Sequence, residues 1–449
     1  MNRRLSRKVL LVTPYFAPQS HAAMFRVHKL AKYLPRYGWK PYVVTTGTNY
    51  LYQEDRGLLD DLPAEVEVYR ARYLEPTARG IRMALGGKDR RYVAANKEED
   101  ADDRRAKRPS ASNRLYKAIL GRWIQVPDAL WTWGRPAIRL ASTLAREQSI
   151  PIVYTTFLPY TSCRIGSELT KDRLRWVADF RDPGTYEARF RSPYPTVASV
   201  QRSLERLALK KADAVTVLSS AYPSIFEHVH KDIGTRPMHF IPTGADDDLV
   251  DRVERAETGF PYLIFAGEYL SEYGNEFFDL FRRAITADVM KGTKLQLLIV
   301  GNRAVNQPLV QPLVDRFGLV GRVELIDHMP QGNLYRYIRG AEAAVLVLPG
   351  TEMWWNNFAK MVDYIALGVP VLAMVPDPSE SRKELESAGT GVFLDGSLNE
   401  ASERLVAFVS GGKRPRVDPA VQRQYLATAQ VKSFVEVFEE LLESQASPA

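Results

Sequence analysis

Two charged side chains in the C-terminal third of the sequence have the types and the spacing of a ligand-binding pair. Lys360 and Asp363 lie three positions apart in a run with helical periodicity, so both fall on one face of the expected helix. A lysine ammonium is a compact charge suited to phosphate, and a carboxylate accepts hydrogen bonds from hydroxyl groups. The alternative is a surface ion pair of little energetic value. The GVPV turn at residues 368–371 favours the ligand-binding interpretation.

A second group of charged residues follows a strand-like run in the middle of the chain. The run is Arg175 to Ala178, and Asp179, Arg181 and Asp182 come shortly after it. The carboxyl ends of parallel strands are where such folds bind ligands. The two carboxylates therefore suit the hydroxyl groups of an acceptor, and we expect Asp182 to act in catalysis. The alternative is an arginine–aspartate clamp that holds the loop.

The sequence lacks the residue patterns of several other kinds of active site. The six histidines have no cysteine partner and no HExxH arrangement, so no metal site is expected. The sequence contains no GxSxG nucleophile elbow, no GxxxxGK[ST] phosphate loop and no GxGxxG fingerprint. These absences argue against an α/β-hydrolase, a P-loop nucleotidase and a nicotinamide-dependent dehydrogenase.

The positive charge of the chain is concentrated in one segment. The 449 residues contain 61 Lys and Arg against 53 Asp and Glu, and 13 of the basic residues but only 6 of the acidic ones lie between Arg79 and Arg122. The middle of this segment, about residues 86–112, has no apolar periodicity and is typical of a solvated insertion. Its end has apolar residues at helical spacing beside basic ones, which predicts either a short helix on an anionic membrane surface or a helix that faces the core. These apolar residues are Leu115, Ile119, Trp123 and Ile124.

The same composition bears on partners and location. No helix-turn-helix, zinc-finger or RNP pattern accompanies the basic segment, so no nucleic-acid partner is expected. The single cysteine, Cys163, cannot form a disulfide within the chain, and no apolar run reaches the 18 residues of a membrane span. The apolar run Val9 to Val12 behind the basic start is too short for a signal peptide. We therefore expect a cytoplasmic protein, with the basic segment 79–122 as its contact with a membrane.

Strands and helices must position these candidate residues. The spacing of apolar residues along the chain alternates between that of strands and that of helices. Lys8 to Thr13 is a strand-like run, Met24 to Leu34 has the pattern of an amphipathic helix, and Pro41 to Thr45 is strand-like again. The alternation restarts after the polar stretch 246–259. The pattern predicts an α/β protein with two doubly wound parallel sheets.

These patterns divide the chain into two domains. Residues 1–245 form the first, with the charged insertion at about 86–112, and residues 259–419 form the second. Residues 420–449 have a helical apolar pattern, and we expect this C-terminal helix to pack back on the first domain.

Four strings occur in a characteristic order along the chain. They are KVLLVTPYFAPQSHAAMFRVHKLAKYLPRYGWKPYVVT, WVADFRDPG, FIPTGAD and AKMVDYIALGVPVLA. Over nearly its whole length the sequence thereby resembles the family-4 group of retaining, nucleotide-sugar-dependent glycosyltransferases. The resemblance implies the GT-B fold, in which two Rossmann-like domains face each other across a cleft. It also implies that the C-terminal domain holds most of the donor, that the N-terminal domain holds most of the acceptor, and that no metal or other cofactor is required.

The resemblance implies roles for particular donor-side residues. The position of Asp363 usually holds a glutamate that binds the nucleotide ribose, and Lys360 is suited to the diphosphate that leaves during catalysis. Gly267 and Glu268 lie in the loop that approaches the diphosphate in the family, and Arg303 offers a further cation.

The loop after the first strand of the chain is also expected to approach the donor phosphate. It lacks the usual glycines, but Ala22 and Ala23 are small enough for close approach. Arg26, in the following helix, could add positive charge, and its alternative is an exposed helix arginine.

Two features depart from the family pattern. A second glutamate of the family, eight residues before the ribose ligand, is replaced by Trp355, which can stack on a sugar or a base or cap a core. The loop with Glu268 and Glu272 is acidic where the family commonly has basic residues, and carboxylates repel a diphosphate unless they turn away or pair with cations.

Taken with the resemblance, the sequence predicts a glycosyltransferase that acts with retention. Its donor is a nucleotide-diphosphate sugar, and its acceptor is a polysaccharide, a lipid-linked molecule or a small molecule. The alternative is a GT-B pseudoenzyme or partner subunit with altered or lost transfer activity, which the acidic loop and Trp355 suggest.

Overall fold

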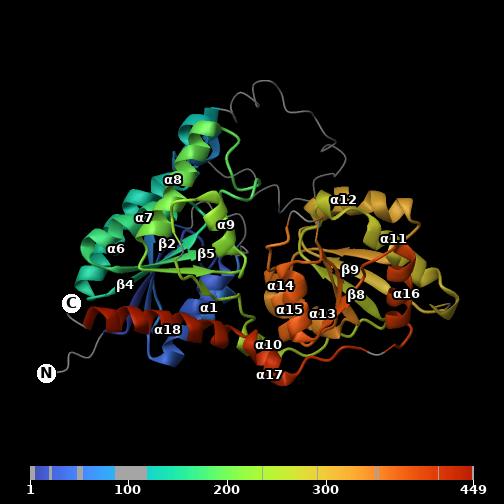
Figure 1. Ribbon diagram of the computed structural model, residues 1–449. Coiled ribbons are helices and arrows are strands. Elements are labelled where there is room, and N and C mark those ends of the chain that lie inside the picture. Colours follow the sequence, from blue (N-terminus) through green and yellow to red (C-terminus); the bar gives the residue numbers. More distant parts are fainter. Residues whose placement is uncertain are drawn as a thin grey trace. The chain divides into compact units, whose positions relative to one another are not determined.

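The chain divides into two compact units (Figure 1). Unit 1 consists of residues 1–218, 222–241 and 431–449, and unit 2 consists of residues 219–221 and 242–430. Residues 420–430, which the sequence pattern assigned to the first domain, therefore belong to unit 2. The computed structural model describes residues 6–19, 23–47, 54–85, 119–234, 236–290, 292–348, 350, 353–412 and 414–446. The candidate Ala22 and the insertion at 86–112 lie outside the described residues.

Unit 1 is built on one sheet of seven parallel strands. The strand order is β3-β2-β1-β4-β5-β6-β7. The direction in which the chain adds strands reverses between β1 and β4, and such a switch point is where doubly wound folds bind ligands. The strands are β1 (Lys8–Val12), β2 (Lys40–Thr46), β3 (Glu67–Ala71), β4 (Ile152–Phe157), β5 (Arg175–Phe180), β6 (Ala214–Val217) and β7 (His239–Phe240).

Helices cover both faces of this sheet. Helices α6 and α7 pack on the strands of one face and α8 packs on α7, whereas α1 and α18 lie on the other face (Figure 1). The apolar positions of α18 are buried from Val431 onward, and the ring of Phe434 lies 5.6 Å from that of Tyr154 on β4. The helices are α1 (Phe25–Tyr33), α2 (Gly57–Asp60), α3 (Ala78–Ala84), α6 (Trp131–Glu147), α7 (Thr161–Leu169), α8 (Pro195–Lys211), α9 (Tyr222–Val229) and α18 (Ala427–Ala446).

Helix α1 differs from the amphipathic helix that the sequence predicts. Its polar side as well as its apolar side is buried. The segment around α2 covers that polar side, because Lys32 pairs with Asp61 at 2.8 Å and the His28 ring lies 2.7 Å from the carbonyl oxygen of Leu58. Polar residues that find partners in this way can be buried in a helix.

Unit 2 repeats the same architecture with six parallel strands. The order is β10-β9-β8-β11-β12-β13, so the switch point lies between β8 and β11. Alternate residues of β8 face opposite sides, with Leu263 and Phe265 in one core cluster and Ile264 and Ala266 in the other. The strands are β8 (Tyr262–Ala266), β9 (Gln296–Val300), β10 (Val323–Ile326), β11 (Ala343–Val347), β12 (Val371–Met374) and β13 (Gly391–Phe393).

The helices of unit 2 complete these two core clusters. Helices α11, α12 and α16 supply apolar residues to the first cluster, and α13, α14 and α15 supply them to the second (Figure 1). In the described part of the chain, every helix of both units falls short of the length and apolar character that a membrane span needs. The helices are α10 (Asp247–Arg252), α11 (Glu276–Thr286), α12 (Arg303–Arg316), α13 (Gln331–Gly340), α14 (Ala359–Ala366), α15 (Glu380–Ala388), α16 (Leu398–Val409) and α17 (Pro419–Gln424).

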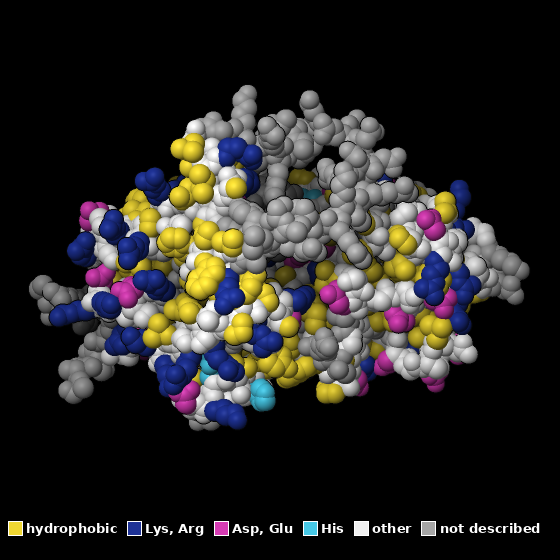
Figure 2. Space-filling model, turned by 90° about the horizontal axis from the view of Figure 1, so that it is seen from above, with side chains coloured by type: hydrophobic (Ala, Val, Ile, Leu, Met, Phe, Trp, Pro, Cys, Tyr) yellow, Lys and Arg dark blue, Asp and Glu magenta, His cyan; other side chains and the backbone are white. Residues whose placement is uncertain are grey.

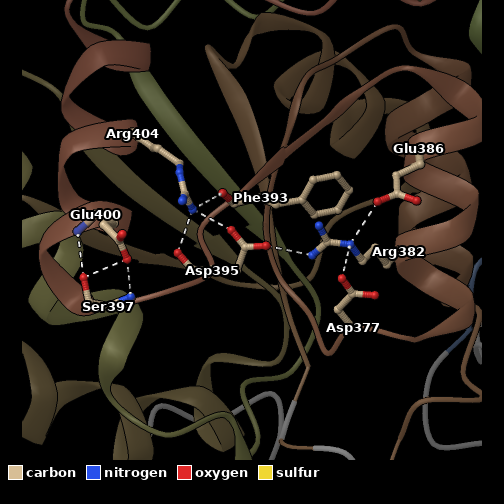
Figure 3. Close-up of polar contacts among 8 residues, drawn as sticks. All are labelled: Asp377, Arg382, Glu386, Phe393, Asp395, Ser397, Glu400 and Arg404. Atoms are coloured by element: carbon tan, nitrogen blue, oxygen red, sulfur yellow. Dashed lines mark hydrogen bonds and ion pairs between the residues drawn. The ribbon is translucent and has the colours of Figure 1, made fainter.

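A network of ion pairs fixes the edge strand β13 (Figure 3). Arg382 of α15 pairs with three carboxylates, and its guanidinium lies 4.1 Å from the ring centre of Phe393. Arg404 of α16 pairs with one of these carboxylates, that of Asp395, as well. Both arginines of this network have carboxylate partners within the unit, so we assign it a structural role. The partners of Arg382 are Asp377 at 3.5 Å, Glu386 at 2.9 Å and Asp395 at 2.9 Å.

Candidate functional site

The donor-side candidates gather at the switch point of unit 2. Strand β8 ends at Ala266 beside β11, and the loop that begins with Gly267 follows it. Helix α14, which carries Lys360 and Asp363, is tied to this strand end, because the hydroxyl of Tyr364 accepts the backbone N–H of Ala266 at 3.0 Å. The GVPV turn ends α14 with Gly368, whose φ of +71° suits glycine.

The loop after β8 is held in a defined conformation. Gly267 has a φ of +118°, which side chains other than glycine rarely adopt. The buried Asn306 of α12 donates to the carbonyl oxygen of Gly267 at 3.2 Å and accepts the N–H of Tyr269 at 2.7 Å. A Cβ on Gly301 would lie 2.4 Å from that same carbonyl oxygen. Glycine at 301 and asparagine at 306 therefore position the loop.

The ammonium of Lys360 lies among aromatic rings at the end of β8. Its Nζ is 3.9 Å from the ring centre of Phe265, 5.5 Å from that of Tyr273 and 5.4 Å from that of Phe358. Among the described residues, no carboxylate pairs with it. Burial lowers the pKa of Lys360 from 10.5 to about 7. Cation–π contacts favour the charged form, and a bound anion would favour it further.

Asp363 is hydrogen-bonded to a tyrosine and is not paired with Lys360. Its Oδ1 accepts a hydrogen bond from the hydroxyl of Tyr335 on α13 at 2.5 Å. Burial, together with the charge of Asp363, raises the pKa of Tyr335 well above its ordinary value, so the phenol remains a donor. The ion pair between Lys360 and Asp363 that the sequence allows as an alternative is not formed.

The remaining donor-side candidates differ in exposure. Arg303 is exposed at the start of α12, and Glu268 and Glu272 are both exposed to solvent. Trp355 is only 1% exposed, which matches the core-capping alternative and leaves little of its ring for a sugar. Ala23 is buried in unit 1.

In unit 1, Asp179 is the centre of a buried clamp. It accepts hydrogen bonds from the guanidinium of Arg26 at 2.8 and 2.9 Å and from the hydroxyls of Tyr154 and Thr216, each at 2.6 Å. Burial alone would raise the pKa of Asp179, but the charge and the hydrogen bonds of Arg26 hold it below its usual value.

This clamp accounts for two of the sequence-based candidates, Arg26 and Asp179. An arginine–aspartate clamp is present, but its cation is Arg26 and not Arg181. Arg26 is 3% exposed and Asp179 is fully buried, so neither is accessible to a ligand, and Arg26 is not the exposed helix arginine that the sequence allows as an alternative.

Arg181 and Asp182 directly follow the carboxyl end of β5, two and three positions after Asp179. Arg181 donates to the carbonyl oxygen of Leu158 at 2.8 Å, and its buried Nε has no hydrogen-bond partner within the described ranges. Asp182 is half-buried, and burial raises its pKa although the charges of Arg181 and Arg189 lower it. A carboxyl group whose pKa is raised is better placed to exchange a proton near neutral pH. These two residues remain the acceptor-side candidates of unit 1.

Sequence reasoning missed two residues that shape the donor-side site. Tyr335 is 28 positions from its partner Asp363, so no local pattern connects them. For Asn306 the sequence offers only a weak indication of a special role. Asparagine is a poor helix former, yet this one lies inside α12. No group of three or more metal-ligating side chains is found in the part of the chain that the structure describes.

Comparisons with known proteins support the fold. No protein-family model and no curated protein matches the chain. Sucrose-phosphate synthase from Thermosynechococcus elongatus has a TM-score of 0.62 at 14% identity, with 97% of this chain and 99% of that chain covered. HepE from Anabaena, solved with UDP and glucose, has a TM-score of 0.57 at 11% identity, with 96% and 99% covered. A putative UDP-N-acetylglucosamine 2-epimerase from Listeria monocytogenes has a TM-score of 0.53 at 12% identity, with 97% of each chain covered. The two Rossmann-like units and these similarities confirm that the chain has the GT-B fold.

Proposed function

We propose that the chain is a glycosyltransferase that takes its sugar from a nucleoside-diphosphate donor bound by unit 2. Lys360 carries this proposal, because its ammonium has no carboxylate partner among the described residues and lies at the switch point of a GT-B fold. A diphosphate is an anion of the kind that this cation can neutralise, and HepE was solved with UDP and glucose. Asp363, on the same helix, is placed to accept hydrogen bonds from ribose hydroxyls.

The chemical step breaks the bond between the anomeric carbon of the sugar and the diphosphate oxygen. The oxygen keeps the electron pair, and the charge of Lys360 stabilises the negative charge that develops. The loop at Gly267 and the exposed Arg303 add to this stabilisation. Asp182 accepts a hydrogen bond from the acceptor hydroxyl and orients it. The oxygen of that hydroxyl forms the new bond to the anomeric carbon, and its proton passes to the departing diphosphate.

The finer features of the reaction are part of the same proposal. The sugar is transferred with retention of its anomeric configuration, and the acceptor is a hydroxyl group of a polysaccharide, a lipid-linked molecule or a small molecule. The exposure of Glu268 and Glu272 favours an active enzyme over a pseudoenzyme, because exposed carboxylates can turn away from a diphosphate.

Turnover of nucleotide sugars tests the proposal. The protein is incubated with UDP-, GDP- and ADP-linked sugars and a set of hydroxyl acceptors, and both the nucleoside diphosphate and the sugar products are measured. We expect acceptor-dependent release of the diphosphate and a glycosylated acceptor, whose anomeric configuration NMR then assigns. An epimerised free sugar formed without any acceptor would contradict transfer, and donor binding without any product would support the pseudoenzyme.

We also propose that unit 1 contacts an anionic membrane through apolar side chains in and beside the basic segment. Leu85 is 82% exposed and Trp123 is 71% exposed, which speaks against the core-facing alternative. Trp123 lies in a single π-helical turn, Leu120–Ile124, and the guanidinium of Arg122 is 5.3 Å from its ring. Hydrophobic and basic side chains lie next to one another on the face shown in Figure 2. Such a combination is typical of a surface that meets anionic lipid.

Cosedimentation with vesicles tests this contact. We expect binding to vesicles that contain phosphatidylserine and weaker binding to neutral ones, with a decrease at high salt because the charges are screened. Trp123→Ser and Leu85→Ser are expected to reduce binding, whereas Val320→Ser, at a residue of unit 2 that is 75% exposed, serves as the matched control. Equal binding by all three variants and the unchanged protein would refute the contact.

A further inference from the structure

Unit 2 contains a polar pocket at the opposite ends of the strands from the donor-side candidates. It has a volume of about 380 Å³ and lies where α13 ends and where β11 and β12 begin. Glu342 of the pocket directly precedes β11, whereas the donor-side switch point lies beyond the other end of that strand. Five residues of β11 at about 3.3 Å each separate the two places by about 16 Å. The pocket is therefore distinct from the proposed donor site.

Arginines dominate the lining of this pocket. Four guanidiniums from three segments of the chain line it, against the single carboxylate of Glu342, which pairs with Arg414. Within the described ranges, Arg255 and Arg416 have no ion-pair or hydrogen-bond partner. The formal charge of the lining is thus strongly positive. The four arginines are Arg255, Arg339, Arg414 and Arg416.

One of these cations is held in place. Arg339 donates to the carbonyl oxygens of Val253 and Val250, both at 2.7 Å, so its guanidinium is fixed at the pocket wall. Burial lowers the pKa of Arg339 and the like charge of Arg255 lowers it further, although the charge of Asp251 raises it in part. Two guanidiniums that repel each other in this way would both be stabilised by an anion between them. A fixed arginine also loses less conformational entropy when it binds a ligand.

The chemistry of the lining indicates the class of ligand. Guanidiniums match the oxygens of phosphate groups through paired N–H donors. The lining residues include no aromatic ring on which a nucleobase could stack. We infer that this arginine pocket binds a small soluble anion with one or two phosphate groups, at a site separate from the nucleotide-sugar donor.

Inorganic pyrophosphate is a suitable probe for this site. It is titrated by calorimetry into the Lys360→Ala variant, in which the proposed donor site has lost its cation. The same titration is made with variants that carry Lys360→Ala together with Arg255→Ala and Arg416→Ala. The matched control carries Lys360→Ala with Arg316→Ala, because Arg316 is an exposed arginine whose guanidinium lies over the ring of Phe317, away from the pocket.

We expect the Lys360→Ala variant to bind pyrophosphate, and we expect each pocket substitution to weaken that binding at least tenfold. The control variant should bind as well as Lys360→Ala alone. Arg255 and Arg416 are exposed, so thermal melting should show that the variants fold. Undiminished binding by the pocket variants, or no binding by Lys360→Ala when the unchanged protein does bind, would overturn the inference. Absence of pyrophosphate binding by the unchanged protein would overturn it as well.

Discussion

Lys360 lowers the stability of the folded protein, and we propose that its charge binds the donor diphosphate. Its pKa falls from 10.5 in the unfolded chain to about 7 in the folded protein. Between these two values the unfolded state binds more protons, so this residue makes the protein less stable as pH falls from 10.5 toward 7. Folding alone therefore does not account for this half-buried lysine, which has no carboxylate partner among the described residues.

We predict that Lys360→Met raises the melting temperature at pH 8. Methionine keeps the apolar contact with Phe265 but removes an amine that must give up its charge when the chain folds at this pH. Differential scanning calorimetry of the variant and the unchanged protein measures the difference. Lys360→Arg is the control, because it keeps the positive charge and should not share the gain. A lower melting temperature for Lys360→Met would show that the ammonium stabilises the fold.

We also predict that donor affinity depends on the protonation of Lys360. The ammonium loses its proton above pH 7 in the free protein, so the affinity for UDP should fall as pH rises from 7 to 9. The Lys360→Arg variant should keep its affinity over this range, because a guanidinium stays charged. Titrations at several pH values compare the two proteins. Identical pH profiles would contradict a role of this ammonium in binding.

Among the helices, strands and loops, the sequence was most informative about the alternating elements and least informative about side-chain partners. Both parallel sheets follow from apolar runs that local periodicity reveals. The cation of the buried clamp could not be predicted, because Arg26 and Asp179 are 153 positions apart and meet only after the sheet forms. The burial of Trp355 could not be predicted either, since an indole suits both a core and a sugar site.

The clamp between α1 and β5 should contribute strongly to the stability of unit 1. Asp179→Ala leaves the charge of Arg26 buried without its partner, which costs about 3 to 5 kcal/mol. Because the pKa of Asp179 is lowered in the folded protein, its contribution is complete above the ordinary value of 3.8 and is lost as pH falls through the lower folded value.

Thermal and urea unfolding at neutral pH measure the effect of Asp179→Ala. Asp232→Ala is the matched control, because Asp232 pairs with Arg206 and Lys210 on the surface of the same unit. We expect the control to unfold nearly as the unchanged protein does. Similar unfolding curves for the two variants would contradict the clamp.

The loop after β8 gives a prediction that separates loop position from charge. Gly301→Ala places a Cβ 2.4 Å from the backbone oxygen of Gly267, so the loop must shift, at a cost of about 1 to 3 kcal/mol. Nucleotide binding should weaken although no charge changes. Gly47→Ala is the control, since a Cβ there meets no atom within 4 Å. Unchanged nucleotide binding by Gly301→Ala would show that the loop conformation does not matter.

For the protein as a whole, the charged insertion should be dispensable for folding. Residues 86–112 have no periodic apolar face, so their deletion removes little core. We expect the shortened protein to unfold as cooperatively as the full chain, with reduced binding to anionic vesicles. Calorimetry and cosedimentation measure the two effects. Loss of cooperative unfolding would show that the insertion is structural.

The GT-B fold could be predicted from the order of four sequence strings, but a fold does not determine an activity. The proposed activity depends on a few side chains that each sheet positions near its switch point. For unit 2 the sequence identified Lys360 and Asp363 but not the residues that surround them. The rings of Phe265 and Tyr273 and the hydroxyl of Tyr335 come from other elements of unit 2. Binding at the switch point of this unit is consequently the claim that most needs a measurement.

Calorimetric titration of UDP and other nucleoside diphosphates into the unchanged protein and the Lys360→Ala and Asp363→Ala variants tests that claim. We predict that the unchanged protein binds at least one of them and that each substitution weakens binding by about 1.5 to 3 kcal/mol, which is roughly 10- to 150-fold. Both variants should remain folded. Binding that survives both substitutions undiminished would contradict the assignment of the donor site.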